Sequence, residues 1–524
     1  MTNPSSLAAA VGRYGKLWGR GHETFSKSSR RILSIKGKGE HATKYLQGLV
    51  TSDLNSEPNA PRMEPMPKQQ DHDMSMEGGG NGSGNGQNMP PPVDVDFTSS
   101  MRSTCFLDQK GRILTDAILW KFPFDETIKE PHNEDDKGDD PNNGEIEYLI
   151  DVPGDSADLL LSHLKKYKLR RTKVTIEDVS DDYSVHSIYG TLNAKGTPPG
   201  FVAAVDPRHP SLGVRVLSFA TSSSSSQNQS QSSPSSTTSE GRKERFTKMN
   251  NKFFPEASGT YEVVGKLIGI AEGSEINGKT ALECNQEHLN AVSFEKGCYL
   301  GQELTARAQF VGTIRKRIMP IIIMDTNMEV PRPWVMASKL QDIGLENLEE
   351  DIVKGLGISS GSGDSTESEF PPLLPKISSL GIGGVVAMMQ GNLKLPTIPT
   401  DNESTMQQVE LSEEENKYMK QLQTESDVLL QDLEKIAIPG AKIVDQKDGK
   451  AIGQIVSHPA SGTPVVFAQM RMDQVGLLKN DSGIKWSQTN KILIGDGMKE
   501  YRYLPFIPLW WPEIDPKTGK GKIQ

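Results

Sequence analysis

The sequence is poor in the residues that build metal cages and disulfide frameworks. It has 3 cysteines and 9 histidines in 524 residues, and no two histidines lie within four positions of each other. Three cysteines without a C-x-x-C pair cannot form a disulfide framework, which indicates a reducing compartment. Scattered histidines leave no H-E-x-x-H or comparable zinc motif. The composition therefore argues against a metal cage built from this chain alone.

Long apolar runs and an excess of positive charge are also missing. The longest apolar runs, at 317–324 and 504–511, both contain proline and are shorter than the roughly 18 residues that cross a bilayer. Acidic residues outnumber basic ones by 68 to 58, which gives a net charge of −10. Such a field repels polyanions. We therefore expect no membrane span and no general nucleic-acid binding.

Glycine and proline are abundant, at 49 and 33 positions, and they mark low-complexity insertions. Residues 1–31 contain six basic residues and one acid, the bias of an organelle transit peptide for the mitochondrion or plastid; an ordinary basic, disordered start is the alternative. Residues 55–99, 124–145, 220–247 and 332–439 are predicted as disordered inserts. The last includes a predicted helix near 412–437, whose apolar stripe suits docking on a domain or, less well, a partner.

The remaining segments alternate between strand and helix patterns. Residues 32–35, 105–108, 113–121 and 148–152 have the pattern of strands, whereas 155–167 has that of an amphipathic helix with Leu159, Leu160 and Leu164 inward. After residue 440 short strands and turns predict a small β-barrel or sandwich. The sequence therefore predicts an α+β protein with split βαβ units.

The segment most informative about function surrounds Cys298. Gly297 and Gly301 flank this cysteine, which predicts a turn that a ligand can approach closely. Lys296 and the N-terminus of a helix starting after Gly301 would both favour the reactive thiolate. Gln302, Glu303 and Arg307 follow, although the last two, at i,i+4, also fit an ordinary helix salt bridge. A small buried hydrophobe is the alternative role for Cys298.

The segment Lys296-Gly-Cys-Tyr-x-Gly-Gln-Glu303, followed by Leu-Thr-Ala-Arg307, resembles the signature of the YgfZ family, and most of all its mitochondrial iron–sulfur cluster assembly factors. These are relatives of the glycine-cleavage aminomethyltransferase. Segments 44–54, 106–116, 167–174, 206–208 and 269–273 fit the same family. The resemblance covers nearly all the ordered residues, and the low-complexity stretches are insertions in it.

The resemblance implies a cloverleaf of two ferredoxin-like units around a central, folate-sized cavity, plus a C-terminal β-barrel. The core would span 32–310, and the barrel 311–331 and 440–524. It implies that Cys298 and Lys296 carry the chemistry and that Cys298 ligates a transient, shared iron–sulfur cluster. Tetrahydrofolate or another ligand would be bound by a set of seven residues, which comprises Asp116, Asn285, Tyr299, Gly301, Gln302, Glu303 and Arg307.

The implied function is that of an assembly factor in the mitochondrial matrix. It would act with A-type carrier proteins to supply [4Fe–4S] clusters to client enzymes. One departure bears on the alternative of a folate-dependent aminomethyl transferase: where that enzyme has paired aspartates, this chain has Thr115-Asp116. A missing carboxylate removes the group expected to orient the folate amine. A redox-active thiol protein without iron is a third hypothesis.

Other candidate residues have simpler interpretations. Cys105 lies beside Phe106 in a predicted strand and is expected in the core, and Cys284 is expected to be incidental. The basic cluster 315–317 and the pair Arg170-Arg171 fit either solvated loop ends or a site for folate glutamates or an acidic partner.

Overall fold

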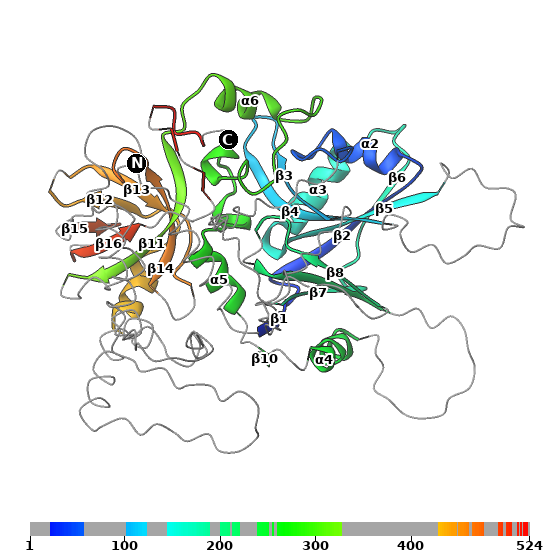
Figure 1. The fold of residues 1–524 in the computed structure, drawn as a ribbon, viewed down its shortest axis with the longest axis horizontal. Helices are drawn as coiled ribbons and strands as arrows, with labels where there is room; N and C mark the ends of the chain where they lie inside the picture. The colour runs from blue at the N-terminus through cyan, green and yellow to red at the C-terminus, as the bar shows by residue number, and fades with distance from the viewer. Residues whose placement is uncertain are drawn as a thin grey trace, which may run out of the picture.

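The computed structural model describes residues 21–56, 101–122, 144–188, 200–209, 212–220, 238–250, 254–255, 259–326, 428–447, 449–460, 464–475, 491–495, 499–505, 511–512, 514–515 and 517–521. These residues form two five-stranded sheets and a closed six-stranded barrel. The barrel lies to one side of the molecule and the sheets to the other, with α5 between them (Figure 1).

The first sheet has the strand order β3-β4-β5-β2-β6, and every neighbouring pair is antiparallel. Its strands are β2 (Arg30–Lys38), β3 (Met101–Leu107), β4 (Ile113–Phe122), β5 (Glu145–Pro153) and β6 (Val174–Asp178). Helices α2 (His41–Gln47) and α3 (Ala157–Tyr167) pack against it. The strands predicted at 32–35, 105–108, 113–121 and 148–152 are confirmed.

Helix α3 shows how the sequence pattern sets the packing. Leu160 and Leu164 lie in the core, as predicted, because residues four apart share a helix face. Leu159 was predicted inward as well, but 49% of it is exposed. Its position next to Leu160 rotates it about 100° away from the buried face.

The second sheet has the order β10-β1-β7-β9-β8. Its strands are β1 (Gly21–Thr24), β7 (Tyr183–Ile188), β8 (Phe201–Val205), β9 (Val214–Phe219) and β10 (Phe254–Pro255), accompanied by α4 (Ser239–Met249) and α5 (Thr260–Ile268). The two sheets share an apolar cluster that includes Trp120 and Leu149 from the first and Val185 and Leu217 from the second. The first sheet is therefore buried on both faces.

Two predicted boundaries were wrong. Residues 21–31 are not part of a disordered leader, because β1 pairs with β7 and β10 and Arg30 is buried in β2. Residues 238–247 belong to α4, whose Phe246 stacks on His186 with ring centroids 4.0 Å apart. The predicted transit segment up to residue 20 and most of the four predicted inserts lie outside the described residues.

The barrel has the strand order β11-β14-β13-β12-β15-β16. Its strands are β11 (Lys316–Asp325), β12 (Lys442–Asp445), β13 (Ala451–Ile455), β14 (Val465–Arg471), β15 (Lys491–Ile494) and β16 (Tyr501–Pro505). Residues 428–436 are helical, and Leu429 and Leu433 pack into the barrel core with Ile443. The α+β class and the C-terminal barrel are confirmed. The first part of the helix predicted near 412–437 lies outside the described residues.

The 3-10 helix η2 (Gly154–Ser156) links β5 to α3. Two further 3-10 helices, η4 (Gly273–Glu275) and η5 (Leu282–Cys284), and then α6 (Gln302–Phe310) connect the sheets to the barrel. An apolar cluster that contains Cys105, Cys284 and Phe467 spans the same region. Within the described residues, no helix is long and apolar enough to span a membrane.

Candidate functional site

The three cysteines differ sharply in accessibility. Cys298 is exposed, whereas Cys105 and Cys284 are buried, as expected for Cys105. Burial raises the pKa of both buried thiols well above the ordinary value. These two thiols are therefore protonated and shielded at neutral pH, and Cys298 is the one cysteine of the chain that another molecule can reach. It lies in the loop that precedes α6, and α6 is the helix labelled near the top of Figure 1.

The loop is anchored by Gly301, which precedes α6 as its N-cap. Its backbone has φ 80°, in the left-handed region that disfavours side chains. A Cβ there would lie 2.6 Å from the Asp108 carbonyl oxygen. Gly111, at the tip of the β3–β4 hairpin, packs equally closely on Gly301 and Leu304. The two glycines let the hairpin and the start of α6 touch, and this contact fixes the end of the cysteine loop.

Gly297 and Gly301, which flank Cys298, differ in their packing. Alanine substitutions at the two positions should therefore differ in their effect on stability. Gly301→Ala should lower the free energy of unfolding by about 2 to 4 kcal/mol, because it combines a left-handed φ with a backbone clash. A Cβ atom at Gly297 would have no other atom within 4 Å. Gly297→Ala should therefore change the free energy of unfolding by less than about 1 kcal/mol. Urea unfolding of both variants measures the difference. Equal losses would contradict the packing described for Gly301.

Lys296 has a structural role that the sequence did not predict. Its Nζ donates to the carbonyl oxygens of Gln47, Val50 and Ser52, at 2.7, 2.7 and 2.9 Å. An ammonium group has three protons, and all three are used in these bonds. Lys296 therefore ties the cysteine loop to the segment after α2 and has no proton left for the Cys298 thiolate. The prediction that the Lys296 charge favours the Cys298 thiolate stays a prediction.

The carbonyl oxygens of Gln47, Val50 and Ser52 form what we call the carbonyl cage. Replacing Lys296, which fills this cage, should destabilise the protein. Burial lowers the pKa of Lys296 to about 8, so the amine is still charged at neutral pH. Lys296→Met should lower the free energy of unfolding by about 2 to 4 kcal/mol, because three buried carbonyls lose their donor. Lys44→Met is the control, since its ion pair with Glu40 is exposed and should be worth under about 1 kcal/mol. Thermal unfolding that shows no difference between the variants would contradict the cage.

The other predicted residues of the segment are partly accounted for by the fold. Tyr299 is buried in the cluster that contains Cys105, and the Lys296 ammonium lies 4.9 Å from its ring centroid. Arg307 pairs with Glu303 at 2.5 Å, with both side chains largely exposed. This is the helix salt bridge that the spacing allowed. Gln302 begins α6, as predicted.

Asn285 is committed to the contact between the core and the barrel. It adopts φ 61°, and its amide nitrogen donates to the Ile318 carbonyl at 2.9 Å. Its side-chain oxygen accepts a hydrogen bond from buried Arg317, also at 2.9 Å. Arg317 pairs in addition with Glu287 at 2.8 Å. Neither residue is therefore free to bind a ligand, and Arg317 is not a solvated loop end.

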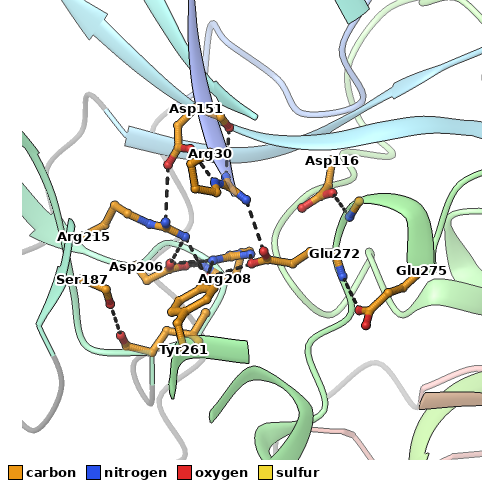
Figure 2. A network of polar contacts seen from close by, with 12 residues as sticks. Arg30, Asp116, Asp151, Ser187, Asp206, Arg208, Arg215, Tyr261, Glu272 and Glu275 are labelled. Atoms are coloured by element: carbon orange, nitrogen blue, oxygen red, sulfur yellow. Dashed lines mark hydrogen bonds and ion pairs between the residues drawn. The ribbon is translucent and has the colours of Figure 1, made fainter. Parts of the chain in front are cut away.

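A second group of polar side chains lies where the two sheets meet α5 and η4 (Figure 2). We call it the junction network. It contains three arginines, three carboxylates and one tyrosine, all with little or no exposure except for part of Glu272. The members are Arg30, Asp151, Asp206, Arg208, Arg215, Tyr261 and Glu272. Its formal charges cancel, which is what burial of ionic groups requires.

The hydroxyl of Tyr261 is the centre of this network. It accepts hydrogen bonds from Arg208 and Arg215, at 2.5 and 2.8 Å, and donates to Glu272 at 2.8 Å. Arg208 also pairs with Asp206 at 2.8 Å and with Glu272. Arg30 reaches across from the first sheet to Glu272, at 3.2 Å. The network therefore links both sheets, and its arginines are already matched by carboxylates.

Asp116 lies beside the junction network and not beside Cys298. Its Oδ1 accepts a hydrogen bond from the Gly273 amide at 2.8 Å. Burial, together with the negative charge of Glu272, raises the pKa of Asp116 to about 6. Burial likewise raises the pKa of Glu275 to about 7. The predicted site residues thus fall into three surroundings: the cysteine loop, the barrel contact of Asn285 and the edge of the junction network.

These raised values make a prediction for stability against pH. A carboxyl group whose pKa is higher in the folded than in the unfolded protein stabilises the folded state. This contribution is fully present at pH values below the pKa of the unfolded chain, and it is lost as the pH rises through the pKa of the folded protein. For Glu275 the window is roughly pH 4.5 to 7. The free energy of unfolding should therefore be about 1 to 2 kcal/mol higher at pH 5.5 than at pH 8.

Denaturant titrations at the two pH values test this expectation. Glu275→Gln keeps an acceptor for the Glu272 amide and should flatten the pH dependence, because the titrating group is gone. Glu295→Gln, at an exposed position of the cysteine loop, is the matched control and should retain it. A flat profile in the unmodified protein would contradict the assignment.

Sequence reasoning missed the junction network as a unit. Asp206, Arg208 and Glu272 lie in segments that fit the family resemblance, but Arg30 was assigned to the leader. One signal was available: Asp151 interrupts the apolar strand 148–152. A carboxylate at a buried strand position needs a cation, and that requirement could have directed the search to the arginines.

Comparisons with known proteins agree with the resemblance read from the sequence. The chain is 29% identical over 316 residues to the mitochondrial iron–sulfur cluster assembly factor IBA57 homologue of Neurospora crassa, a match covering 56% of this chain and 52% of the relative. It is 29% identical over 317 residues to the homologue of Dictyostelium discoideum, covering 56% and 62%. It is 30% identical over 239 residues to that of Aspergillus fumigatus, covering 42% and 46%.

These relatives confirm the resemblance to iron–sulfur cluster assembly factors. The chain spans little more than half the length of the first two. No protein-family model matches the chain. Among solved structures, the glycine cleavage system aminomethyltransferase T from Bartonella henselae aligns with a TM-score of 0.44 and 8% identity, over 97% of this chain and 90% of that one.

Proposed function

We propose that this protein is an iron–sulfur cluster assembly factor of the mitochondrial matrix, in which Cys298 supplies one ligand to a cluster shared with another protein. The observation that carries the proposal is the exposure of Cys298 on a loop fixed at both ends, while the two other cysteines are buried. The relatives support the role and the location, since their names call them mitochondrial assembly factors.

The proposal needs a partner, because an iron–sulfur cluster is held by about four protein ligands. This chain has one accessible cysteine, and its described residues contain no group of three or more His, Cys, Asp and Glu side chains placed to hold a metal ion. In this proposal the cluster is cargo that passes between proteins and not a resident cofactor. A single exposed thiolate is suited to completing a ligand set that another protein supplies in part.

The finer parts of the proposal follow from the family resemblance. The partner would be an A-type carrier protein, the product a [4Fe–4S] cluster formed from [2Fe–2S] units, and the recipients client enzymes of the organelle. The cloverleaf arrangement around a central cavity belongs to the same proposal. The two sheets that meet at the junction network, and the barrel that contacts them through the cluster of Cys105 and Phe467, are compatible with it.

The test is an anaerobic reconstitution. An A-type carrier loaded with [2Fe–2S] is mixed with reductant and an apo client enzyme, with and without this protein, and [4Fe–4S] formation is followed by absorbance and electron paramagnetic resonance. We expect the protein to raise the yield. An unchanged yield would refute an assembly role, whereas a raised yield that does not require Cys298 would refute only the ligand assignment.

A folate-dependent aminomethyl transferase is the second candidate function. Asp116, a buried carboxyl with its pKa raised to about 6, is the feature that favours it. The described surroundings of Asp116 fit tetrahydrofolate poorly, however. The nearby arginines are paired within the junction network, and the Lys266 ammonium is held by the His458 carbonyl at 2.8 Å and by Glu262. A cation free to bind the folate carboxylates is not found among them.

Two measurements decide between the candidates. Calorimetric titration with tetrahydrofolate should show no saturable binding up to about 1 mM, a dissociation constant that corresponds to a binding free energy of only about −4 kcal/mol. The purified protein should also fail to release a one-carbon unit from an aminomethyl donor to tetrahydrofolate. Turnover in that assay would establish the transferase and displace the assembly factor as the preferred function.

A further inference from the structure

A strongly basic surface lies at the end of α3, far in sequence from the cysteine loop. Residues 165–173 read Lys-Lys-Tyr-Lys-Leu-Arg-Arg-Thr-Lys and contain six cations and no acid. All six are exposed. We call them, together with Leu169, the α3–β6 basic patch. In a chain of net charge −10, such a concentration of positive charge is a local feature that mutual repulsion opposes.

The backbone presents this patch as a projecting turn. The Thr172 amide donates to the Leu169 carbonyl at 2.9 Å, which places Arg170 and Arg171 at the two central positions of the turn. Beside the turn is a hollow of about 420 Å³ lined by Lys165, Lys168, Leu169, Arg170 and Ile176. The patch therefore combines a protruding tip with a shallow basic depression. Helix α3 and strand β6, which flank the turn, lie with the first sheet on the side of the molecule opposite the barrel (Figure 1).

Structural requirements explain only part of the charge. Lys165 and Lys166 occupy the last turn of α3, where cations are favoured by the helix dipole. Lys168, Arg170, Arg171 and Lys173 lie beyond it. Among the described residues, none of these four forms a salt bridge, and Asp178 of the adjoining strand is engaged by Arg31. Four cations are therefore presented to solvent without an ion pair to any described residue.

Leu169 indicates the kind of anion that the patch suits. It is 56% exposed between Lys168 and Arg170. A nucleic-acid surface or an acidic peptide would gain little from a leucine at the centre of the contact. A membrane interface would gain from it, because clusters of Lys and Arg bind anionic headgroups while an apolar side chain enters the acyl boundary. The hollow can accept a phosphate-bearing headgroup beside the leucine.

We propose that the α3–β6 basic patch binds the surface of a membrane rich in anionic phospholipid, with the cations on the headgroup phosphates and Leu169 inserted. This peripheral contact is independent of the proposed cluster chemistry, since no member of the patch belongs to the cysteine loop. It would place the protein at a membrane surface by a contact that requires no membrane-spanning segment.

The experiment is flotation of the full-length protein with vesicles. Phosphatidylcholine vesicles with about 30 mol% phosphatidylglycerol should bind it at about 0.1 M salt, whereas pure phosphatidylcholine should not. The triple variant Lys168→Gln, Arg170→Gln, Arg171→Gln should bind on the order of 100-fold more weakly. The control variant Lys435→Gln, Lys442→Gln, Lys447→Gln removes as much charge from exposed positions of the barrel side and should bind as the unmodified protein does.

Further measurements distinguish a membrane from the other ligands that the α3–β6 basic patch could bind. Leu169→Asn should weaken vesicle binding about tenfold, and an unchanged affinity would show a purely ionic contact and overturn the proposal. Saturation of the same residues by inorganic phosphate alone, with loss of vesicle binding at constant ionic strength, would indicate a small-anion site instead. Preference for single-stranded oligonucleotide over vesicles would also overturn it. Vesicle binding that appears only after the acidic residues of 124–145 are neutralised would overturn the proposal as well, because that acidic stretch of the same chain would then be the ligand of the patch.

Discussion

Replacing Cys298 with alanine should reduce [4Fe–4S] formation in the reconstitution to the level found without the protein, a loss of at least about tenfold if the thiolate is an obligatory ligand. Because Cys298 is exposed, the same change should alter the free energy of unfolding by less than about 0.5 kcal/mol. The combination of lost activity and unchanged stability is the signature of a ligand and not of a structural residue.

Two controls make this result specific. Glu295→Gln removes an exposed charge three residues before Cys298 in the same loop and should leave both yield and stability nearly unchanged. Cys298→Ser tests whether a hydroxyl substitutes for the thiolate, and it should be as inactive as alanine. A Cys298→Ala protein that supports the full yield would leave the loop without its proposed function.

Removing Arg208 from the junction network should have the largest effect on stability, a loss of about 3 to 5 kcal/mol in Arg208→Met. Asp206 and Glu272 would remain buried with one cation fewer, and Tyr261 would lose a donor. Removing one partner of a buried ion pair leaves an uncompensated charge, which costs more than the pair contributes. Urea unfolding at pH 7.5 measures the change.

The matched control is Arg31→Met, one residue from Arg30 on β2. Arg31 pairs with Asp158 and Asp178 at the surface and should contribute less than about 1 kcal/mol. In addition, Arg208 and Arg30 lower the pKa of Glu272 in the folded protein. The ionised Glu272 should therefore stabilise the folded protein at pH values above its pKa in the unfolded chain, and this contribution should fall as the pH drops below that value. Arg208→Met should shift that acid loss to higher pH. An unshifted acid transition would contradict the coupling.

The fold could be predicted where periodicity was strong and local. The strands at 113–121 and 148–152 and the helix at 155–167 follow from alternation and from the Leu160–Leu164 spacing. The leader boundary could not be predicted, because β1 and the start of β2 form only through pairing with β7, β10 and β5. Those partners lie far along the chain, and short apolar stretches contain no signal of distant pairing.

The candidate site divides in the same way. The exposure of Cys298 and the helix after Gly301 could be predicted from glycine and helix-start patterns in adjacent residues. The cage around Lys296 could not, because its three acceptors come from residues 47–52, about 250 positions earlier in the chain. Every residue has a backbone carbonyl, so no pattern of residue types indicates which carbonyls accept these hydrogen bonds.

The barrel draws its strands from both sides of a very long stretch of chain. Strand β11 ends at Asp325, yet it pairs with β14 and β16, which begin at Val465 and Tyr501. During synthesis the first strand must wait for well over a hundred further residues before its partners exist, while the sheets that precede it can already form. Closure of this module should therefore be the last and slowest event of maturation, and it is the step at which an incomplete chain would be most exposed to aggregation.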